Sequence, residues 1–303
     1  MTLLDVINKI ESAAKAQRAV HTIVGGDILR LNTIPYAQYG AFAWVQRQHS
    51  EDRDAGLRTY AFSLFYVDRL THDRRNELEI QAVGIRTLEN ILARLEDDGI
   101  PSGAHSFDTF NIRFTDECAG VWTDVTFTVA ASPCAPEFTA TIDRAFSGAP
   151  STLRDVVRAM EAAASYLPQV SGCVPNDIYR LNTIPDARYG VFGWTQGQHY
   201  REEDADVVQY RFNLFYVDRL THDRGNEAAV QSVGVDTLAA VLAALDDIGL
   251  YSQQVTFDAF TERFTDECAG MMASVVIYAP VALLCAEGSG DFNADFSDDF
   301  YIY

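Results

Sequence analysis

Residues 62–74 read FSLFYVDRLTHDR, and residues 212–224 read FNLFYVDRLTHDR. The apolar first half of each segment predicts a buried strand and the charged second half predicts a turn, so the same strand and turn occur twice in the sequence. The offset of 150 positions also aligns three further segments: RLNTIP at 30–35 with 180–185, RFTDECAG at 113–120 with 263–270, and TLLDV at 2–6 with TLRDV at 152–156. A spacing this long is typical of a duplicated domain and not of a solenoid of short repeats. The sequence therefore predicts two copies of one domain, each long enough to bury its own core.

The repeat sets the expected domain boundaries. The first copy spans 1–131 and the second spans 151–286, with a Pro-, Ala- and Gly-rich linker at 132–150. Residues 287–303 differ from both copies, because acidic residues there alternate with aromatic ones after a glycine hinge. This acidic-aromatic segment is open to two interpretations, a frayed tail or an arm that docks on a partner.

Periodicity predicts the elements of the first half of each copy. Apolar residues at helical spacing predict a helix over 2–16, with Thr2 as its N-cap. Residues 27–35 are expected to be extended. Alternating patterns then predict a hairpin with strands at 39–49 and 59–70, the second covered by helices on at least one side because both of its faces are bulky.

The second half of each copy begins with a long helix. Asn76 and Glu79 have the spacing of a capping box, and Gly99 marks the end of the helix. Residues 107–120 are expected to form a loop that leads into a last strand at 121–131. Each copy is thus predicted to run α-β-β-β-α-β, and the fold class is α+β with sheets packed against helices.

The charge and the cysteine content of the chain argue against two classes of function, tight nucleic-acid binding and metal binding by cysteines. The net charge is −20, with 14 basic and 20 acidic residues up to position 150 and 9 basic and 23 acidic residues beyond it. Such an acidic chain repels phosphate, so tight nucleic-acid binding is disfavoured, although DNA could pass along it without sticking. The five cysteines have no metal-binding spacing and suit free thiols in a reducing cytosol. We expect neither a signal peptide nor a membrane span.

The charged turn is the first candidate site. Asp68, His72 and Asp73, or their counterparts Asp218, His222 and Asp223, could hold a divalent metal or act as a base with an orienting acid. Each acid is close in sequence to an arginine that would neutralise it, Arg69 or Arg74 in the first copy and Arg219 or Arg224 in the second. An ion-paired turn or a subunit contact is therefore the preferred interpretation, ahead of metal binding or catalysis.

Four other candidates favour structure over chemistry. Cys118 and Cys268 each follow two acids, which would raise a thiol pKa, whereas a catalytic thiolate needs a cationic neighbour. His49 and His199 end a strand, and Trp44 and Trp194 lie mid-strand, where core packing is expected over a carbohydrate platform. The glycines of IVGGD are not repeated in the second copy, so no phosphate loop is predicted.

The two copies also agree at polar residues that look exposed. These residues are Arg30, Asn32, Gln48, Asp68, Arg69, Asp73, Arg74, Asn76 and Glu77. An interface that meets its own equivalent around a ring would constrain such residues in both copies. This agreement favours assembly over catalysis.

The pattern FxLFYVDRLxxDxxNExxxQxxG, followed by FxxRFxDECAG, belongs to a stretch of roughly residues 28–129 that recurs at 178–279, so it involves most of the chain. It resembles virion proteins of phages that infect gut Bacteroidetes, including crAss-like phages. The predicted element order is also similar to the small α/β domain of tail-terminator and tail-completion proteins, which form rings between head and tail. The resemblance implies a tail or neck component.

The function expected from these observations is structural and not enzymatic. The chain would form a homo-oligomeric ring in the neck or tail of a virion, assembled in the host cytoplasm beside other neck, tail or portal proteins, with no cofactor, metal or membrane. The expected interface residues are Asp68, Arg69, Asp73, Arg74, Asp218, Arg219, Asp223, Arg224, Phe292, Phe296 and Phe300. The alternatives are a metal-dependent hydrolase that uses the turn and a glycan-binding module that uses Trp44 and Trp194.

Overall fold

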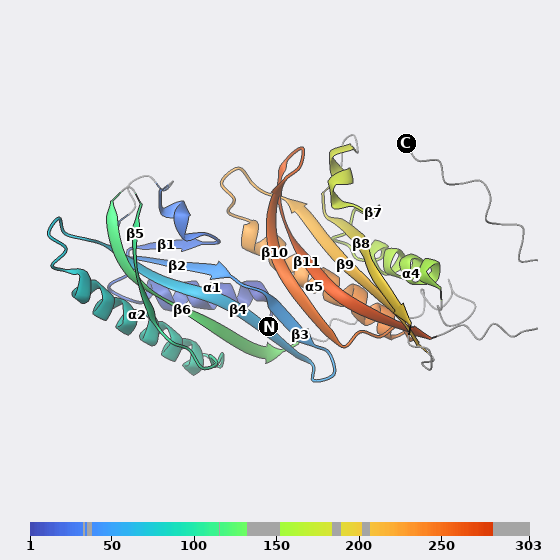
Figure 1. Cartoon of the computed structure of the whole chain (residues 1–303), viewed down its shortest axis with the longest axis horizontal. Coiled ribbons are helices and arrows are strands. Elements are labelled where there is room, and N and C mark those ends of the chain that lie inside the picture. The colour runs from blue at the N-terminus through green and yellow to red at the C-terminus, as the bar shows by residue number, and fades with distance from the viewer. Residues whose placement is uncertain are drawn as a thin grey trace, which may run out of the picture.

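The structure is a computed structural model, in which helices cover one face of a long curved sheet (Figure 1). It describes residues 1–32, 34, 38–114, 116–131, 152–183, 189–201 and 207–280. The expected linker at 132–150 lies outside the described residues. So does the expected terminal arm with Phe292, Phe296 and Phe300.

The described elements of the first half recur about 150 residues later, with one long strand of the second half in place of two strands of the first. The first half contains α1 (Leu3–Lys15), β1 (Thr22–Gly25), η1 (Ile28–Asn32), β2 (Ala41–Gln46), β3 (His49–Asp52), β4 (Leu57–Arg69), α2 (Glu77–Asp97), β5 (Asp108–Arg113) and β6 (Glu117–Ala130). The second half contains α4 (Leu153–Ser165), β7 (Gly172–Pro175), η2 (Ile178–Thr183), β8 (Val191–Arg201), β9 (Val207–Arg219), α5 (Glu227–Asp246), β10 (Gln254–Arg263) and β11 (Glu267–Pro280). The molecule is therefore a mixed α+β protein, as expected.

The strands of both halves belong to one sheet of 11 strands. Within the first half, β4 is central: it pairs with β2 and β3 on one side and with β6 on the other, and β6 pairs with β5. The second half repeats this order with β8, β9, β11 and β10. Only β1–β2 and β7–β8 are parallel among these pairs. The registers repeat as well, since Ala41 faces Val67 and Val191 faces Val217.

The helices form one layer on the sheet. Each of α1 and α4 begins with a capping box, in which Thr2 or Thr152 accepts a hydrogen bond from the residue three positions on. Contacts within the layer run from α2 to α1, from α1 to α5 and from α5 to α4. The central strand β4 presents Tyr60, Phe62, Leu64 and Tyr66 to these helices, all at most 2% exposed. The predicted helix 2–16, the hairpin and the cover on β4 are confirmed.

Three local predictions were wrong. Of the expected extended segment at 27–35, residues 27–32 are not extended, because Asp27 Oδ1 accepts the Leu29 N–H at 2.8 Å and starts the 3₁₀-helix η1. Residues 107–120 are not a loop, because β5 and β6 form a hairpin there. Asn76 precedes α2 without capping it by its side chain, which is used elsewhere in the turn.

The two halves are joined along the sheet. β3 of the first half pairs antiparallel with β10 of the second, so the sheet is continuous. The main apolar cluster includes residues of both halves, whereas the sequence predicted a separate core for each copy. The reason is α5, which packs against β9, β11, α4 and also α1 of the first half. This helix is long and apolar enough to cross a membrane, but most of it is buried in the protein.

Candidate functional site

The junction between the halves is the most elaborate polar site in the described part of the chain. Its backbone consists of β3 and β10, which pair from Asp52 with Gln254 to His49 with Phe257. The N–H of Arg53 continues the ladder to the carbonyl of Gln253 at 3.4 Å. The two strands are not equivalent in the repeat, because β3 corresponds to the end of β8 and β10 corresponds to β5. The junction therefore joins two different surfaces.

Two arginines of the first half anchor the junction. Arg58 is 3% exposed; its Nε lies 2.5 Å from Glu51 Oε2 and its Nη1 lies 2.8 Å from Asp236 Oδ1 on α5. Arg53 pairs with Asp246 at the end of α5 and donates to Ser252 Oγ at 2.8 Å. Buried charges are stable only when paired in this way, so both arginines depend on the second half.

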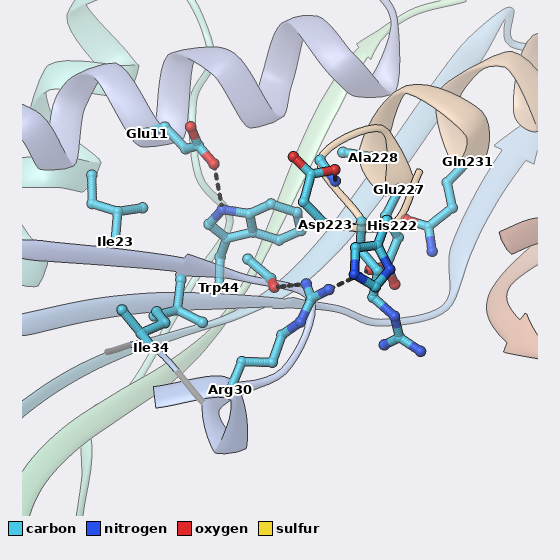
Figure 2. A pocket seen from close by; sticks show the side chains of 15 residues that line it. Glu11, Ile23, Arg30, Ile34, Trp44, His222, Asp223, Glu227, Ala228 and Gln231 are labelled. Carbon is cyan, nitrogen blue, oxygen red and sulfur yellow. Dashed lines mark hydrogen bonds and ion pairs between the residues drawn. The ribbon is translucent and has the colours of Figure 1, made fainter. Parts of the chain in front are cut away.

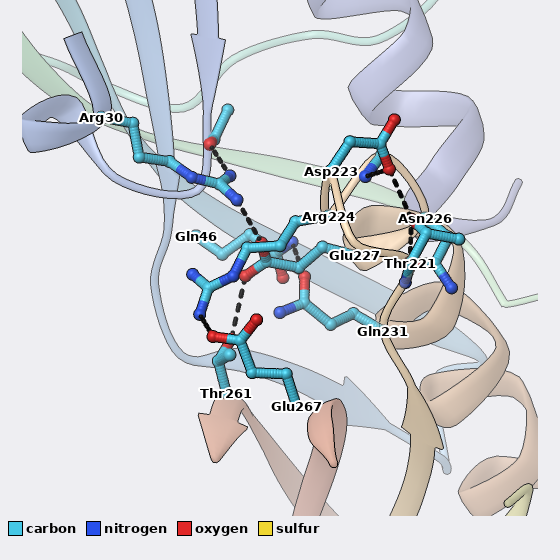
Figure 3. Close-up of polar contacts among 12 residues, drawn as sticks. Arg30, Gln46, Thr221, Asp223, Arg224, Asn226, Glu227, Gln231, Thr261 and Glu267 are labelled. Atoms are coloured by element: carbon cyan, nitrogen blue, oxygen red, sulfur yellow. Dashed lines mark hydrogen bonds and ion pairs between the residues drawn. The ribbon is translucent and has the colours of Figure 1, made fainter. Parts of the chain in front are cut away.

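Three further contacts across the junction use residues that are identical in both copies, and Figure 3 shows two of them, Arg30–Glu227 and Gln46–Gln231. Arg30 Nη2 lies 3.0 Å from Glu227 Oε2, while Arg30 Nη1 donates to the carbonyl of Gly25 at 2.7 Å. Glu227 Oε2 is buried and forms no aligned hydrogen bond, so its attraction to Arg30 is chiefly ionic.

The remaining two of these contacts are amide contacts. Gln46 Nε2 donates to Gln231 Oε1 at 2.6 Å, and Gln48 Nε2 donates to Asp258 at 3.0 Å. Both cross from the first half to the second. Together with the Arg30 pair they form three contacts across the junction, and each of the six residues is identical to its counterpart in the other copy.

An open pocket of about 590 Å³ lies beside these contacts (Figure 2). Gly25, Gly26 and Arg30 of the first half line one side, and His222 and Arg224 of the second charged turn line the other. Trp44 closes the inner wall, where its Nε1 donates to Glu11 at 3.2 Å. The second turn thus lies against the β1–η1 segment of the first half.

His49 lies inside the junction, only 1% exposed. Its Nδ1 accepts the Ala61 N–H at 3.1 Å, and its Nε2 lies 3.2 Å from Gln46 Oε1. This arrangement suits the neutral ring with a proton on Nε2. Burial lowers the pKa of His49 to about 4, because desolvation disfavours the charged form.

The two charged turns have the same internal construction. In the first, Asn76 Oδ1 accepts the Thr71 N–H at 2.9 Å and Asn76 Nδ2 donates to the Arg69 carbonyl at 3.0 Å. Thr71 Oγ1 donates to Asp73 at 2.8 Å. Arg74 adopts a left-handed backbone with φ of 55°, and its counterpart Arg224 has φ of 54°. Such a backbone is unfavourable for arginine and persists because the surrounding contacts hold it.

The arginines of the turns pair with the second repeated motif, RFTDECAG. Arg69 lies 2.8 Å from Asp116, and Arg74 lies 3.2 Å from Glu117. The second copy repeats both pairs, as Arg219–Asp266 at 2.8 Å and Arg224–Glu267 at 2.7 Å. The sequence predicted an ion-paired turn but placed the pairing within the turn itself. The partners of Arg69 and Arg74 come instead from a strand end about 45 residues away along the chain, whereas Asp73 pairs locally with Arg75 at 3.0 Å.

Only the second turn takes part in the junction. The first turn borders a separate surface hollow with Arg113, Asp116 and Glu117. The two turns therefore differ in environment although they are nearly identical in sequence and in hydrogen bonding.

The chemical alternatives find little support. The described residues contain no group of three His, Cys, Asp or Glu side chains placed to hold a metal, so Asp68, His72 and Asp73 do not form one. Trp44 and Trp194 are each 4% exposed, which contradicts a carbohydrate platform. Burial, with a smaller contribution from Asp116, raises the pKa of Cys118 to about 11, against a nucleophilic role.

Glycines of the repeated motifs serve packing. A Cβ on Gly84 would lie 3.0 Å from Tyr66 and 3.1 Å from Val121, so this glycine lets α2 approach the sheet closely. A Cβ on Gly120 would meet the Tyr66 carbonyl at 2.4 Å. The agreement of the two copies at these positions therefore reflects structure and not chemistry.

Sequence reasoning missed most of the junction. It singled out Arg30 and Gln48, but not the other junction residues Gln46, Glu51, Arg53, Arg58, Glu227, Gln231, Asp236, Asp246 and Asp258. A comparison of the two long helices could have indicated the junction, because α5 has Ala239 and Ala240 where α2 has Glu89 and Asn90. A helix that is more apolar than its twin has a second buried face.

No family model, curated protein or solved structure matches this chain.

Proposed function

We propose that this chain is a duplicated structural protein of a bacteriophage virion, which assembles side by side into a ring at the neck or tail in the manner of a tail terminator. The observation that carries the proposal is the junction between the halves, which joins the β3 edge of one copy to the β10 edge of the next. The chain thus already contains one step of a head-to-tail assembly.

A junction of this kind has a consequence for the ends of the chain. Contacts between two different surfaces leave one unused surface at each end, and repetition then yields a closed ring or an open helical filament. In the described part of the chain, the counterparts of the two joined surfaces are unpaired: the end of β8 at 199–201, beyond the part that pairs with β7, and the outer edge of β5. A duplicated chain would give a ring with half as many chains as repeats.

The charge of the chain suits a position around DNA. A net charge of −20 leaves the surface repelling phosphate, so DNA could move through a channel without being held. The phage assignment itself rests on the repeated motifs at 62–84 and 110–120. The neighbours would be portal, neck or tail proteins, with Phe292, Phe296 and Phe300 of the terminal segment as candidate contacts.

The mass of the assembled protein tests this proposal. We expect light scattering and native mass spectrometry of the purified full chain to show a discrete oligomer at high concentration, and electron microscopy of particles to place the chain in a ring at the neck or tail. A monomer at every concentration, together with no ring of this chain in the particle, would overturn the proposal.

A further inference from the structure

We infer that a second copy of this chain docks by strand addition: residues 199–201 at the exposed end of β8 in one chain pair with residues 105–107 of the next, in the register that joins β3 to β10. This inference rests on the proposed function and names the surfaces that build the assembly. Each residue at the internal junction has a counterpart 150 positions away, at one of the two exposed surfaces.

The first comparison concerns the β8 side, which corresponds to the β3 side of the junction. His49 is 1% exposed under β10, whereas His199 is exposed at the end of β8. Leu3 of α1 is fully buried near α5, where the Leu4 N–H donates to Ser232 Oγ at 3.1 Å. Its counterpart on α4, Leu153, is only half-buried. The residues that are buried at the junction, His49 and Leu3, therefore have more exposed counterparts beside β8.

The second comparison concerns the β5 side, which corresponds to β10. Val255 and Phe257 are buried in the junction, whereas His105 is exposed and Phe107 is half-buried. Residues 103–106 lie before β5 as an exposed segment. An exposed segment that leads into an edge strand can pair with an added strand, and the main-chain hydrogen bonds then supply the affinity.

The third comparison concerns polar contacts, and it shows that the two free edges are complementary. Arg180 on the β8 side and Glu77 on the β5 side are the counterparts of the Arg30–Glu227 ion pair. The counterparts of Gln46–Gln231 are Gln196 and Gln81, and those of Gln48–Asp258 are Gln198 and Asp108. All six residue types are retained, so the same three contacts can form between chains.

The buried ion pair between Arg58 and Asp236 has no equivalent among the counterpart residues at the two exposed surfaces. Val208 stands where the first half has Arg58, and Arg86 stands where the second half has Asp236. On α2, Glu89 and Asn90 are exposed in place of the buried Ala239 and Ala240. The contact between chains is therefore more polar than the internal junction. A polar, partly complementary contact suits reversible association that depends on protein concentration.

Reversal of one charge on each edge tests the inference. Arg180→Glu places two acids across the contact, and Glu77→Arg places two bases across it. We expect each variant alone to weaken assembly of the full chain at least about tenfold in dissociation constant. An equimolar mixture should restore assembly, because every contact in an alternating oligomer then pairs opposite charges.

Arg158→Glu is the matched control, since Arg158 is exposed on α4 and its counterpart Asn8 stays exposed beside the junction. It makes the same charge change as Arg180→Glu and should leave assembly unchanged. Circular dichroism melts should show that all three variants fold.

The outcomes separate the two proposals. Wild-type protein that stays monomeric at every concentration overturns the ring and this interface together. Wild-type protein that assembles while both charge variants assemble equally well, or while the mixture fails to recover, overturns the interface alone. Loss in each variant with recovery in the mixture supports the β8-to-β5 contact.

Discussion

At the scale of single residues, identical side chains have different properties in the two halves. His49 and His199 occupy equivalent strand positions, yet one is buried under β10 and the other is exposed. No local pattern distinguishes them, because the difference arises from a strand about 200 residues away in the chain. Sequence reasoning predicted both as ordinary surface or core residues for this reason.

His49 predicts a pH dependence of folding. Its pKa is lowered to about 4 in the folded chain, so between pH 6.5 and 4 the unfolded chain binds the extra proton. The free energy of unfolding therefore falls as pH falls through this window, by on the order of 3 kcal/mol from this group. Urea unfolding of wild-type and His49→Gln protein at several pH values measures the difference in slope.

The exposed counterpart provides the control for this experiment. His199→Gln should keep the slope of the wild-type protein across the same range. An unchanged slope in the His49→Gln protein would show that His49 does not carry this dependence.

Asn76 predicts the stability of the charged turn. Its side chain bridges the Thr71 N–H and the Arg69 carbonyl, so Asn76→Ala leaves both backbone groups without this partner. We expect a loss of about 1–3 kcal/mol in the free energy of unfolding. Chemical denaturation measures it, with His72→Ala, an exposed residue of the same turn, as a control that should change stability by less than about 0.5 kcal/mol. Equal effects of the two variants would contradict this account of the turn.

At the scale of elements, the sequence predicted what depends on local pattern. The amphipathic helix with its Thr2 cap and the alternating strand β4 need only nearby residues, and both were found. The hairpin of β5 was missed because its strands become recognisable only through pairing with β6. The 3₁₀-helix η1 was missed because the turn at Asp27 is stronger than the extended tendency of its apolar residues.

The buried ion pairs of Arg58 should contribute strongly to the free energy of unfolding, because they connect β3 and β4 with α5. Arg58→Met removes the partner of Glu51, which is 8% exposed, and also the partner of Asp236. We expect a loss of about 3–5 kcal/mol in the free energy of unfolding, because a buried charge is left without compensation. Denaturant titration measures this loss.

A double variant separates the unpaired charge from lost packing. Arg58→Met combined with Glu51→Gln should recover part of the stability, since the buried carboxylate is then neutral. A double variant that is as unstable as the single one would show that the ion pair with Glu51 is not the cause.

At the scale of the whole molecule, the two copies are joined head to tail, through a different edge of each copy. The two halves share one sheet and one apolar cluster, so they form a single folded body in the described part of the chain. The sequence showed the repeat, but it did not show which strand edge of one copy pairs with which strand edge of the other. The internal junction shows this pairing, and it is the reason for expecting further chains to add at both ends.

Disulfide trapping between chains tests this expectation most directly. In the internal junction Ser50 faces Thr256, and their counterparts are Tyr200 at the β8 edge and Ser106 at the β5 edge. A chain with both Tyr200→Cys and Ser106→Cys should form, on mild oxidation, a ladder of covalent oligomers linked between positions 106 and 200, identified by peptide mass spectrometry. Each single variant should lack this link. Assembled protein that never forms the 106–200 link would contradict the edge-to-edge assembly proposed here.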